Sequence, residues 1–486
     1  MKNVLLTHSY FLRFDPKQWS TGQPYAPLGT LYAASLLREK GYNISVFDVM
    51  FSYTPNELLP ALNKFHPDIF VIYDDGFNFL TKMCLTNMRE AAFLMIAMAK
   101  QKKCIIIVSS SDSTDHYQDY LQAGADFIII GEGELTLLEL IDSLSLEKTD
   151  LSQVSGIAFQ KDGAIIKTNK RPVLKDLDSL PFPAWDLIDI MPYKKTWLKH
   201  SGFFSINMTT TRGCPFKCNW CAKPIYGNRY NVRSPKNVIE ELKLLSRFSY
   251  DHVWFCDDIF GLKPGWVEEF SSLLQSENVQ LRFKIQSRAD LLQDDKVVRA
   301  LGFAGCENAW VGAESGSQKI LDAMDKGITI QQIQNATALL KENNIKPSLF
   351  IQFGYPGEGK EDIKLTISMI RRLLPQEIGI SVSYPLPGTT FYENVKSQLR
   401  QKANWTDSNE LALMFNSTYQ PAFYRQLHRY VHQTLRREKA FHSLKQIVKN
   451  PFSTTLLHIR KVLSMIYYVP ATFIDKLKLT QLERTL

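Results

Sequence analysis

Three cysteines lie close together in the segment TTTRGCPFKCNWCAKP, which spans residues 209–224. They are Cys214, Cys218 and Cys221, so their spacing is C-x3-C-x2-C, and no fourth cysteine stands nearby. Thiolates are soft ligands that select zinc or iron–sulfur clusters. A structural zinc site needs four protein ligands, whereas a 4Fe–4S cluster held by three cysteines keeps one iron open to a small molecule. The spacing therefore predicts a catalytic cluster.

A zinc site is the alternative, because Cys256, at the end of a later predicted strand, could supply a fourth ligand. Cys84, Cys104 and Cys306 lie within apolar patterns and are expected to be core thiols. The odd total of seven cysteines in a long chain argues against a disulfide scaffold and favours a reducing compartment. Trp220, directly before the third clustered cysteine, is expected to shield the metal site from water.

The composition is that of a soluble globular protein with a large core, since 45% of the 486 residues are hydrophobic and 22% are charged. The net charge is +8, and the residues after 400 account for it with 13 Lys and Arg against 5 Asp and Glu. A neutral main body argues against a nucleic-acid-binding surface. The longest apolar stretch, Val462–Ile474, is interrupted by polar residues and a proline and is too short to span a bilayer. We therefore expect a cytoplasmic protein, or one peripheral to a membrane.

Short apolar runs alternate with helical patterns over the first part of the chain. The runs lie at 3–6, 44–48, 68–73, 104–108 and 126–130. Continuous apolar strands separated by helices are typical of a parallel sheet covered on both faces, so the pattern predicts a doubly wound, Rossmann-like α/β domain over residues 1–148. Its ligands are expected at the carboxyl ends of the strands. The turn residues and prolines of residues 149–200 indicate a linker.

Predicted strands and helices alternate again after this linker. The strand candidates lie at 203–209, 252–256, 282–286, 307–311, 347–353 and 377–383. Six parallel units are too few for a closed eight-stranded barrel, so the pattern over 201–395 predicts an open, partial (β/α)6 barrel. The three cysteines follow the first of these strands directly, at the edge where such barrels carry their sites. Residues 396–486 are expected to form a helical C-terminal region.

Four later segments, together with the cysteine motif, resemble the radical S-adenosylmethionine (radical SAM) superfamily. They are WFCDDIF (254–260), GAESGS (312–317), IQFGYPGE (351–358) and SYPLPGT (383–389). Each falls at the end of a predicted strand, in the order in which that superfamily uses them. The resemblance implies a 4Fe–4S cluster on the three cysteines, with S-adenosylmethionine (SAM) bound at the open iron.

By the same resemblance, SAM is contacted from the strand ends. The implied contacts are Trp220, Asp257, Asp258, Arg288, Gly312, Glu314, Ser315, Gly354 and Pro356. The second strand departs from the superfamily, which has a Gly-Gly-Glu-type edge for the amino group of SAM where this chain has two aspartates. A carboxylate can still pair with an ammonium group. Arg288 contacts SAM or the substrate, or else pairs with Asp290, and Lys319 and Lys326 are expected to be solvated.

The first domain resembles the cobalamin-binding domain of B12-dependent radical SAM enzymes. The resemblance rests on APLGTLYAASLLREKGYNISVFD (26–48), IIIGEGELTLLEL (128–140) and the linker string LPFPAWDL (180–187). It implies that cobalamin is contacted from the turns after the fourth and fifth strands. The residues of these turns are Ser109, Ser110, Ser111, Gly131, Glu132, Gly133 and Glu134.

Mutase-type cobalamin domains supply a lower cobalt ligand from a D-x-H-x-x-G string, which this chain lacks. His8 and His116 are therefore expected to be structural, and the cobalt to have no protein histidine beneath it. Asp74, Asp75 and Asn78 are weaker candidates for contact with the corrin or the substrate. A nucleotide-binding Rossmann domain is the alternative, which is disfavoured because GEGE lacks the third glycine of G-x-G-x-x-G.

The enzyme group that the chain resembles includes class B methyltransferases and the anaerobic cyclase that closes the fifth ring of chlorophyll precursors. The resemblance implies reductive cleavage of SAM, abstraction of a hydrogen atom from an inert carbon, and transfer of a methyl group from methylcobalamin to that carbon. The cofactors carry this chemistry, while the protein binds, orients and excludes water. The implied partners are a small, hydrophobic substrate and a one-electron donor such as flavodoxin or ferredoxin.

Other functions stay open. A B12-dependent cyclase or rearrangement enzyme would use the same cofactors without methyl transfer. A tRNA methylthiotransferase would need three more cysteines in the first domain, where only Cys84 and Cys104 occur. The non-enzymatic hypothesis is a binding protein that is stabilised by zinc or that carries a corrinoid. The basic, aromatic C-terminal helices are expected either to cover the substrate pocket as a solvated lid or to lie on an anionic membrane surface.

Overall fold

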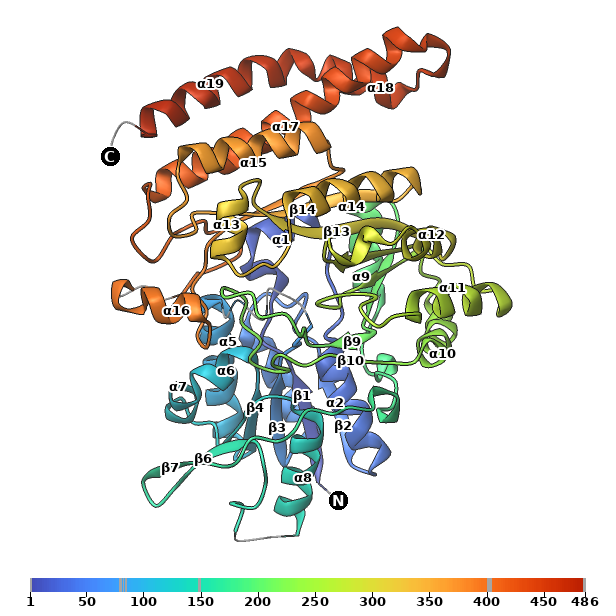
Figure 1. The fold of residues 1–486 in the computed structure, drawn as a ribbon. Coiled ribbons are helices and arrows are strands. Elements are labelled where there is room, and N and C mark those ends of the chain that lie inside the picture. The colour runs from blue at the N-terminus through green and yellow to red at the C-terminus, as the bar shows by residue number, and fades with distance from the viewer. Residues whose placement is uncertain are drawn as a thin grey trace.

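A seven-stranded sheet forms the centre of the N-terminal part of the computed structural model (Figure 1). The structure describes residues 2–77, 81, 83, 85–146, 150–399 and 404–483, without the side chain of Ser453. The strand order is β2-β1-β3-β4-β5-β6-β7, and the first five strands in that order run parallel. The strands are β1 Asn3–Thr7, β2 Asn43–Phe47, β3 Ile69–Tyr73, β4 Ile105–Ser109, β5 Phe127–Ile129, β6 Ile157–Lys161 and β7 Ala164–Lys167.

Helices cover both faces of this sheet. Successive side chains of its strands point into two different apolar cores, one on each face. Leu5 and Phe70 lie in one core, whereas Val4 and Val71 lie in the other. Strands that are buried on both sides need no polar face, which explains their continuous apolar runs. The helices are α1 Pro16–Thr21, α2 Leu28–Glu39, α3 Leu58–Phe65, α5 Thr86–Gln101, α6 Ser111–Asp115, α7 Tyr117–Gln122 and α8 Glu134–Ser145. The predicted doubly wound architecture is confirmed.

Residues 157–167, within the range predicted as a linker, extend the first sheet. They form β6, which pairs antiparallel with β5, and β7, which pairs antiparallel with β6. Ile157 and Ala158 in β6 are fully buried, so this hairpin covers the open edge of β5 with apolar side chains. An unpaired edge strand exposes hydrogen-bonding groups, and the hairpin removes that exposure. The connection that follows contains α9 Met191–Ser201.

A second sheet holds six parallel strands in the order β15-β14-β13-β12-β11-β8. They are β8 Ser205–Met208, β11 His252–Phe255, β12 Phe283–Ser287, β13 Cys306–Glu314, β14 Lys346–Phe353 and β15 Ile378–Val382. Val253, Phe255 and Phe283 lie in the core under the outer helices. These helices are α10 Pro235–Leu245, α11 Trp266–Ser276, α12 Asp295–Phe303, α13 Gln318–Ala323, α14 Ile330–Glu342, α15 Lys360–Leu373 and α16 Thr390–Val395. The predicted open barrel is confirmed.

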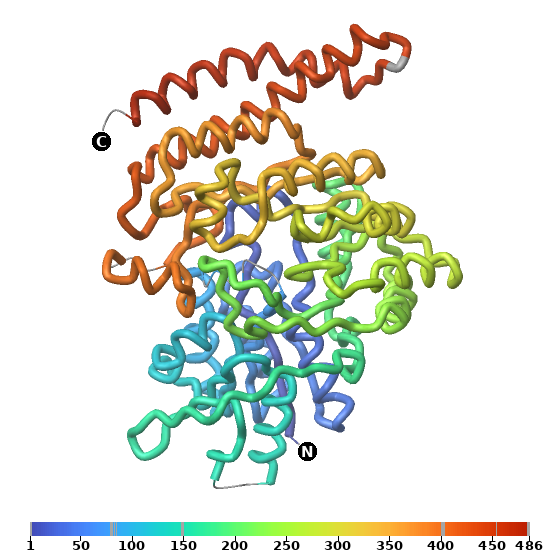
Figure 2. Tube along the Cα trace, in the orientation of Figure 1, coloured from blue at the N-terminus to red at the C-terminus, as the bar shows by residue number. Residues whose placement is uncertain are grey.

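The C-terminal region is helical, as expected, and consists of α17 Pro421–Lys449, α18 Leu456–Leu463 and α19 Met465–Glu483. Before α17 the chain touches the first domain, where Trp405 accepts from the Thr86 N–H at 2.8 Å and Ser408 donates to Asp15 at 2.7 Å. Figure 2 shows that α18 and α19 form an outer layer at the opposite end of the molecule from the N-terminus. No helix in the described ranges has both the length and the apolar character needed to cross a bilayer.

The carboxyl edges of the two sheets face each other across an interface that belongs to the largest apolar core. Asn207 in β8 donates to the carbonyl of Ala26 and accepts from the Ala26 N–H, both at 2.8 Å. Tyr25, the preceding residue, packs edge-on against Trp254 of β11 with 6.3 Å between ring centroids. The segment that enters α2 is therefore held directly by the barrel.

Gly305 sets the position of β13, whose far end carries the predicted SAM contacts. Its φ of +94° belongs to the region that favours glycine, and a Cβ there would lie 1.8 Å from the carbonyl oxygen of Leu281. The carbonyl of Gly305 accepts from the N–H of Phe283, the first residue of the neighbouring strand. Only glycine permits this close approach of two backbones.

We expect Gly305→Ala to destabilise the protein more than Gly41→Ala does. Both glycines have positive φ, but an alanine Cβ at Gly41 would meet nothing within 4 Å. The difference isolates the clash with Leu281, which should cost about 1–3 kcal/mol beyond the shared backbone strain. Thermal unfolding of the two variants measures it, and equal apparent Tm values would contradict the proposed role of Gly305.

Candidate active site

The three clustered cysteines lie in one loop at the carboxyl edge of the barrel. The loop is closed at its base by β9 Thr211–Arg212 and β10 Asn231–Val232, which pair antiparallel. Gly213 has a φ of +79°, and a Cβ there would lie 2.4 Å from the carbonyl oxygen of Arg229. The loop can cross itself at this point only because the residue before Cys214 is glycine.

Asn219, between the second and third cysteines, anchors the loop to the barrel. Its N–H donates to the carbonyl of Met324 at 3.0 Å, and its side-chain amide donates to the carbonyl of Ala323 at 2.7 Å. Its side-chain oxygen accepts from the hydroxyl of Tyr355 at 2.8 Å, and its carbonyl accepts from the N–H of Phe391 at 3.0 Å. The cysteine spacing did not single out this residue.

Lys223 holds the other side of the loop. Its ammonium donates to the carbonyl of Phe216 and, at 2.8 Å, to the side chain of Asn228. Trp220 packs against the small apolar cluster that includes Ile320 and Met324. The residues between the cysteines therefore position the loop, while the thiols stay at its surface.

Asp257 supports the segment that leads into the loop. Its carboxylate accepts from the N–H groups of Thr210 and Thr211 at 2.7 and 2.9 Å and from the hydroxyls of Thr209 and Thr210. Burial raises the pKa of Asp257 to about 6, although the four hydrogen bonds oppose the rise. A carboxylate with its oxygens engaged in this way is a structural group. Asp258, the neighbouring residue predicted to contact SAM, is half-buried.

Arg233 holds the same segment from the opposite side and was also missed from the sequence. It is buried, donates to the carbonyl of Thr209 at 2.8 Å and pairs with Glu241 of α10 at 2.5 Å. The indole of Trp266 donates to the Arg233 carbonyl at 2.7 Å. A lone arginine after a short loop carries no sequence signal, because its partners come from two helices that lie later in the chain.

Arg288 pairs with Asp290, which is one of the two alternatives that the sequence offered. Its guanidinium forms two hydrogen bonds to Asp290, at 2.9 and 3.1 Å, and it also lies 3.8 Å from the sulfur of Cys218. It stacks over the ring of Phe216, 3.7 Å from the centroid, and donates to the carbonyl of Lys326 at 2.9 Å. Arg288 is buried, so its charge acts on the cysteine loop at low screening.

Lys326 is buried, and the expectation that it would be solvated is wrong. Its ammonium pairs with Glu314 at 2.7 Å and lies 5.9 Å from the ring centroid of Trp220. Burial alone would lower the pKa of Lys326, but the charges of Glu314 and Cys218 outweigh it and raise that pKa. A Cβ on Gly312 would come within 2.7 Å of the ammonium, so the glycine makes room for the ion pair. Lys319, by contrast, is exposed and pairs with Asp362 at 2.7 Å.

The thiols fit a metal cluster in their chemistry. Burial raises the pKa of Cys214, and Asp258 contributes to the rise, while two buried cations flank Cys218. A cluster held by three thiolates is anionic, and positive charges that are already in place stabilise it. Within the described ranges, no three His, Cys, Asp or Glu side chains form a group that could hold a metal ion.

The end of β13 is strained at Glu314. Its φ of +57° is unusual for a residue with a side chain, and the pairing of β13 with β14 shifts register between Gly312 and Glu314. Strain of this kind is held in place by its surroundings and clusters at functional sites. Ser315 is fully buried, and its hydroxyl contacts that of Thr366 at 3.2 Å. The backbone of this turn, rather than the Ser315 hydroxyl, is left to face a ligand.

The end of β14 carries Gly354 and Pro356. Gly354 has a φ of +77°, and its N–H donates to the carboxylate of Glu358 at 2.6 Å. Burial raises the pKa of Glu358 to about 8, and its other oxygen is buried without a hydrogen-bond partner. The predicted contacts on the four later strand ends therefore lie along one edge with the cysteine loop.

The turn after β5 binds the base of the cysteine loop. Arg212, buried between the domains, pairs with Glu132 at 2.5 Å and with Glu134 at 2.7 Å. Three aromatic rings surround the guanidinium, namely Tyr32, Phe77 and Tyr226. Both carboxylates predicted to contact cobalamin are thus engaged by Arg212.

The turn after β4 presents hydroxyl groups at the same edge. Ser110 caps α6 through its contact with Ser113 at 2.8 Å. The hydroxyl of Ser111 is buried and has no hydrogen-bond partner among the residues that the structure describes. Ser109 lies close to Gly133, where a Cβ would come within 2.8 Å of its hydroxyl. An orphaned buried hydroxyl calls for a ligand or water, which fits a cofactor at this edge.

The histidines and acids of the first domain form internal contacts. His8 pairs with Asp48 at 2.8 Å, and Asp74 accepts from the N–H and hydroxyl of Ser9 at 2.6 and 2.8 Å. Asp75 accepts from the N–H of Phe77, and His116 lies 3.9 Å from both Asp112 and Asp119. Asn78 and Cys84 lie outside the described residues.

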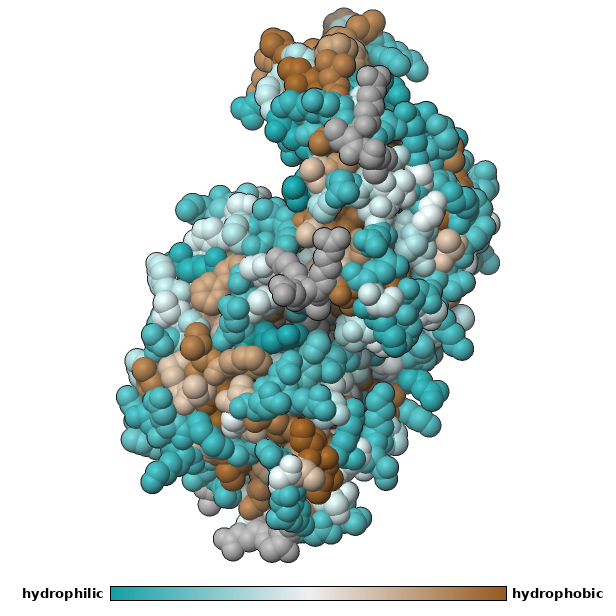
Figure 3. Space-filling view, turned by 90° about the vertical axis from the view of Figure 1, so that its left-hand side faces the viewer, coloured by the Kyte–Doolittle hydropathy of each residue, from teal (hydrophilic) through white to brown (hydrophobic). Residues whose placement is uncertain are grey.

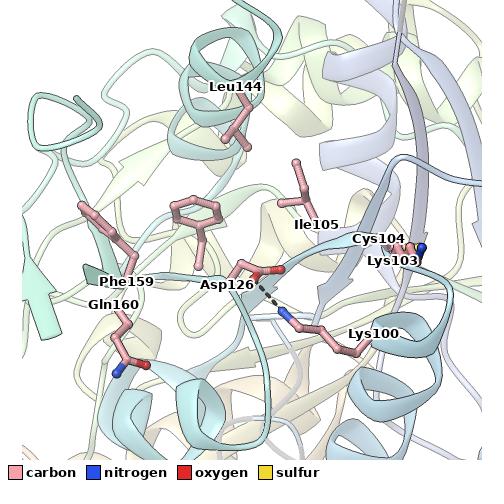
Figure 4. A pocket seen from close by; sticks show the side chains of 9 residues that line it. Lys100, Lys103, Cys104, Ile105, Asp126, Leu144, Phe159 and Gln160 are labelled. Carbon is pink, nitrogen blue, oxygen red and sulfur yellow. Dashed lines mark hydrogen bonds and ion pairs between the residues drawn. The ribbon is translucent and has the colours of Figure 1, made fainter. Parts of the chain in front are cut away.

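The hollow drawn in Figure 4 lies away from this edge. Its volume is about 570 Å³, and it opens at the amino-terminal ends of β4 and β5, where Lys100 pairs with Asp126 at 2.8 Å. Cys104 lines it as a buried thiol. It contains none of the residues predicted to bind the cluster, SAM or cobalamin.

The comparison with protein families matches the barrel and its loop. Residues 208–370 match the model of the Radical SAM superfamily. This segment is a radical SAM domain. The matched range contains the cysteine loop and the ends of β11 to β14, so the resemblance seen in the sequence is confirmed where the site lies.

Two curated relatives extend beyond the radical SAM domain. An uncharacterized methyltransferase of Pyrococcus horikoshii is 28% identical over 78% of this chain and 80% of its own length. The anaerobic magnesium-protoporphyrin IX monomethyl ester cyclase of Synechocystis is 28% identical over 66% of this chain. The aligned part spans 62% of the cyclase, which is less than two thirds of its length.

Solved structures share the fold of both domains. The radical SAM methyltransferase TsrM of Kitasatospora setae, solved with cobalamin and a 4Fe–4S cluster, covers 82% of this chain and 75% of its own at a TM-score of 0.67. The cobalamin-dependent radical SAM enzyme OxsB, solved with aqua-cobalamin, covers 98% of this chain and 72% of its own at 0.73. Both are 17% identical to this chain. The predicted order of a doubly wound domain, a partial barrel and a helical end is thereby confirmed.

We expect Asp257→Asn to lower both the apparent Tm and the iron content after anaerobic reconstitution. Asparagine keeps one acceptor oxygen and turns an amide toward the donors of Thr210, which should cost about 1–3 kcal/mol. Asp295→Asn, which removes an exposed carboxylate from α12, is the matched control. If Asp257→Asn matches this control in Tm and iron content, Asp257 does not hold the cysteine loop.

Proposed function

We propose that this chain is a cobalamin-dependent radical SAM enzyme that transfers a methyl group to an unactivated carbon of a small molecule. The observation that carries the proposal is the position of the cysteine loop between two candidate cofactor edges. Its base, Arg212, is bound by the turn after β5, and its middle, Cys218, lies beside the cations that follow β12 and β13. One loop thus adjoins the strand ends of both sheets.

Cys214, Cys218 and Cys221 would hold the cluster. SAM would lie along Asp258, Glu314 and the turn at Gly354, and cobalamin along the turns after β4 and β5. When bound, these groups supply an electron for the reductive cleavage of SAM and a methyl group for the substrate. A soluble one-electron donor of the flavodoxin or ferredoxin type would supply the electron.

The side chains of this chain have their own tasks in such a reaction. Arg288 and Lys326 place two positive charges beside Cys218 and so favour added negative charge at the cluster. Trp220, packed against Ile320 and Met324, excludes water from one side of the loop. Arg212 fixes the distance between the loop and the first domain, because its two carboxylate partners belong to that domain.

A cyclase without methyl transfer is the second candidate, and the relative from Synechocystis supports it. The zinc alternative is weakened by Cys256, whose thiol donates to the carbonyl of Met208 within the barrel sheet. The place of the protein in the cell is part of the proposal as well. We propose contact with a membrane surface through the C-terminal helices, on the basis of their exposed side chains.

The test of the cluster is the variant Cys218→Ala. The unmodified protein, reconstituted anaerobically and supplied with SAM, hydroxocobalamin and dithionite, is expected to form 5′-deoxyadenosine, and the variant is expected to lose at least 100-fold of that activity because the cluster loses a ligand. Cys306→Ala, which changes a buried thiol outside the loop, should retain activity. Mass spectrometry measures the product, and equal yields from Cys218→Ala and Cys306→Ala would refute the assignment.

The accompanying product separates the two candidate reactions. S-adenosylhomocysteine formed together with 5′-deoxyadenosine is expected for methyl transfer, since one SAM supplies the methyl group and another is cleaved. Formation of 5′-deoxyadenosine without S-adenosylhomocysteine, in the presence of a turned-over substrate, would favour cyclisation or rearrangement.

We further expect Lys326→Met to shift the midpoint potential of the reconstituted cluster to a more negative value. The reduced cluster carries one more negative charge, so removal of a buried cation beside Cys218 destabilises it. Lys319→Met is the control, because Lys319 is exposed and pairs with Asp362. A redox titration followed by electron paramagnetic resonance measures the shift, and equal potentials in the two variants would show that Lys326 has no electrostatic role.

A further inference from the structure

The last helix of the chain carries a row of apolar side chains that faces outward, although Leu479 and Leu482 near its end pack against the core. Thr472 and Asp475 of α19 are buried against α17, whereas Ile466, Phe473 and Leu477 on the opposite side are 79%, 64% and 57% exposed. The spacings of 7 and 4 residues put these three side chains in one row along the helix. A helix on the surface of a soluble protein normally shows the reverse arrangement, with its apolar stripe toward the core.

Specific polar contacts hold α19 in this orientation. Asp475 pairs with Arg429 of α17 at 3.2 Å, and Gln426 donates to the carbonyl of Asp475 at 3.1 Å. Arg437 donates to the hydroxyl of Thr472 at 3.1 Å. These contacts lie on the inner side of the helix, so a rotation that buried the apolar row would break all of them and bring charged groups to the outside.

The neighbouring helix adds to the same surface. No residue of α18 is buried, and its exposed side chains include Leu456, Leu457, Ile459 and Leu463. Phe452, in the turn before α18, is fully exposed. Figure 3 shows apolar side chains gathered over the helices at the top of the molecule. Contiguous apolar surface of this kind marks a site of contact with another apolar body.

Positive charge surrounds this apolar surface. Residues 441–483 contain six Lys and Arg but only two acids, and both acids are already paired, Asp475 with Arg429 and Glu483 with Lys360. Helical spacing puts Lys476 and Lys478 on the two borders of the apolar row of α19. Lysines at these borders can extend their ammonium groups toward phosphate while their stems lie along apolar surface.

We propose that the outer face of α18 and α19 binds the surface of an anionic membrane. The apolar row would enter the boundary between headgroups and acyl chains, and the lysines beside it would meet lipid phosphates, which is the arrangement of an interfacial helix. A second copy of this chain fits less well, because its equally basic face would be brought against the first. The inference does not depend on the proposed reaction, since the surface contains no residue assigned to the cluster, SAM or cobalamin.

The test is co-sedimentation of the full-length chain with vesicles of phosphatidylcholine, with and without phosphatidylglycerol. We expect binding to the anionic vesicles that weakens with added salt. The variant Ile466→Ser/Phe473→Ser/Leu477→Ser should bind at least about tenfold more weakly, since it loses three apolar anchors. Arg460→Gln/Lys461→Gln should lose about fivefold for each charge at low salt.

Phe303→Ser is the matched control, because Phe303 is 75% exposed on α12 at a distance in sequence from these helices. It should bind like the unmodified chain. Because every substituted position is exposed or half-buried, all variants should keep the apparent Tm of the unmodified protein. Absence of binding to anionic vesicles, or equal binding by the triple variant and the control, would overturn the proposal. A dimer in solution that only the triple variant dissociates, without vesicle binding, would overturn it in favour of self-association.

Discussion

The charge of Arg212 is buried at the centre of the molecule, and the relation between the two domains depends on it. Removal of a guanidinium from water is costly, and only well-placed opposite charges offset that cost. Glu132 and Glu134 supply them from the first domain, and three aromatic rings close off the solvent. Burial alone would lower the pKa of Arg212, but these carboxylates raise it. Removal of either carboxylate would therefore leave the buried guanidinium of Arg212 with only one acidic partner.

Arg212 is also the last residue before the glycine that turns the chain into the cysteine loop. The segment that leads into it is held by Asp257, which follows β11, and by Arg233, which lies just before α10. The cysteine loop thus begins from a segment fixed by groups on three sides. Beyond Gly213, Asn219 between the second and third cysteines restrains the backbone of the loop through its contacts with Met324, Ala323 and Tyr355.

The C-terminal helices follow a different physical logic. α17 buries Phe423, Leu427 and Val431 in the same core as the barrel, so it is part of the catalytic body. α19 attaches to α17 through polar side chains such as Asp475 and Thr472. It keeps the apolar row of Ile466, Phe473 and Leu477 outside. The proposed membrane contact would place the enzyme at a lipid surface. A hydrophobic substrate dissolved in that membrane would then lie near the proposed active site.

The sequence by itself determined the elements and the identity of the metal-binding loop. Apolar runs without polar interruption could only be strands buried on both faces, and every expected strand of the barrel lies within a few residues of its place. Three cysteines at C-x3-C-x2-C needed no tertiary information, because their spacing alone brings them into one loop. The order of the strand-end segments is likewise a property of the chain.

Tertiary structure decided the roles of the charged residues. Two neighbouring aspartates look alike in sequence, yet the structure gives them different surroundings. Asp257 is buried and accepts from three successive threonines, whereas Asp258 is half-buried and contributes to the raised pKa of Cys214. A lysine such as Lys326 is expected from its sequence to be solvated, but here it is buried in an ion pair with Glu314. Glu132 and Glu134 contact Arg212 across about 80 residues of sequence. The outward row of α19 has an ordinary helical period, and only the contacts of Asp475 show which side faces α17. The periodicity of a sequence indicates which residues share one face of a helix or strand. It does not indicate what that face packs against or which residue neutralises a buried charge, because both depend on contacts between residues far apart in the sequence.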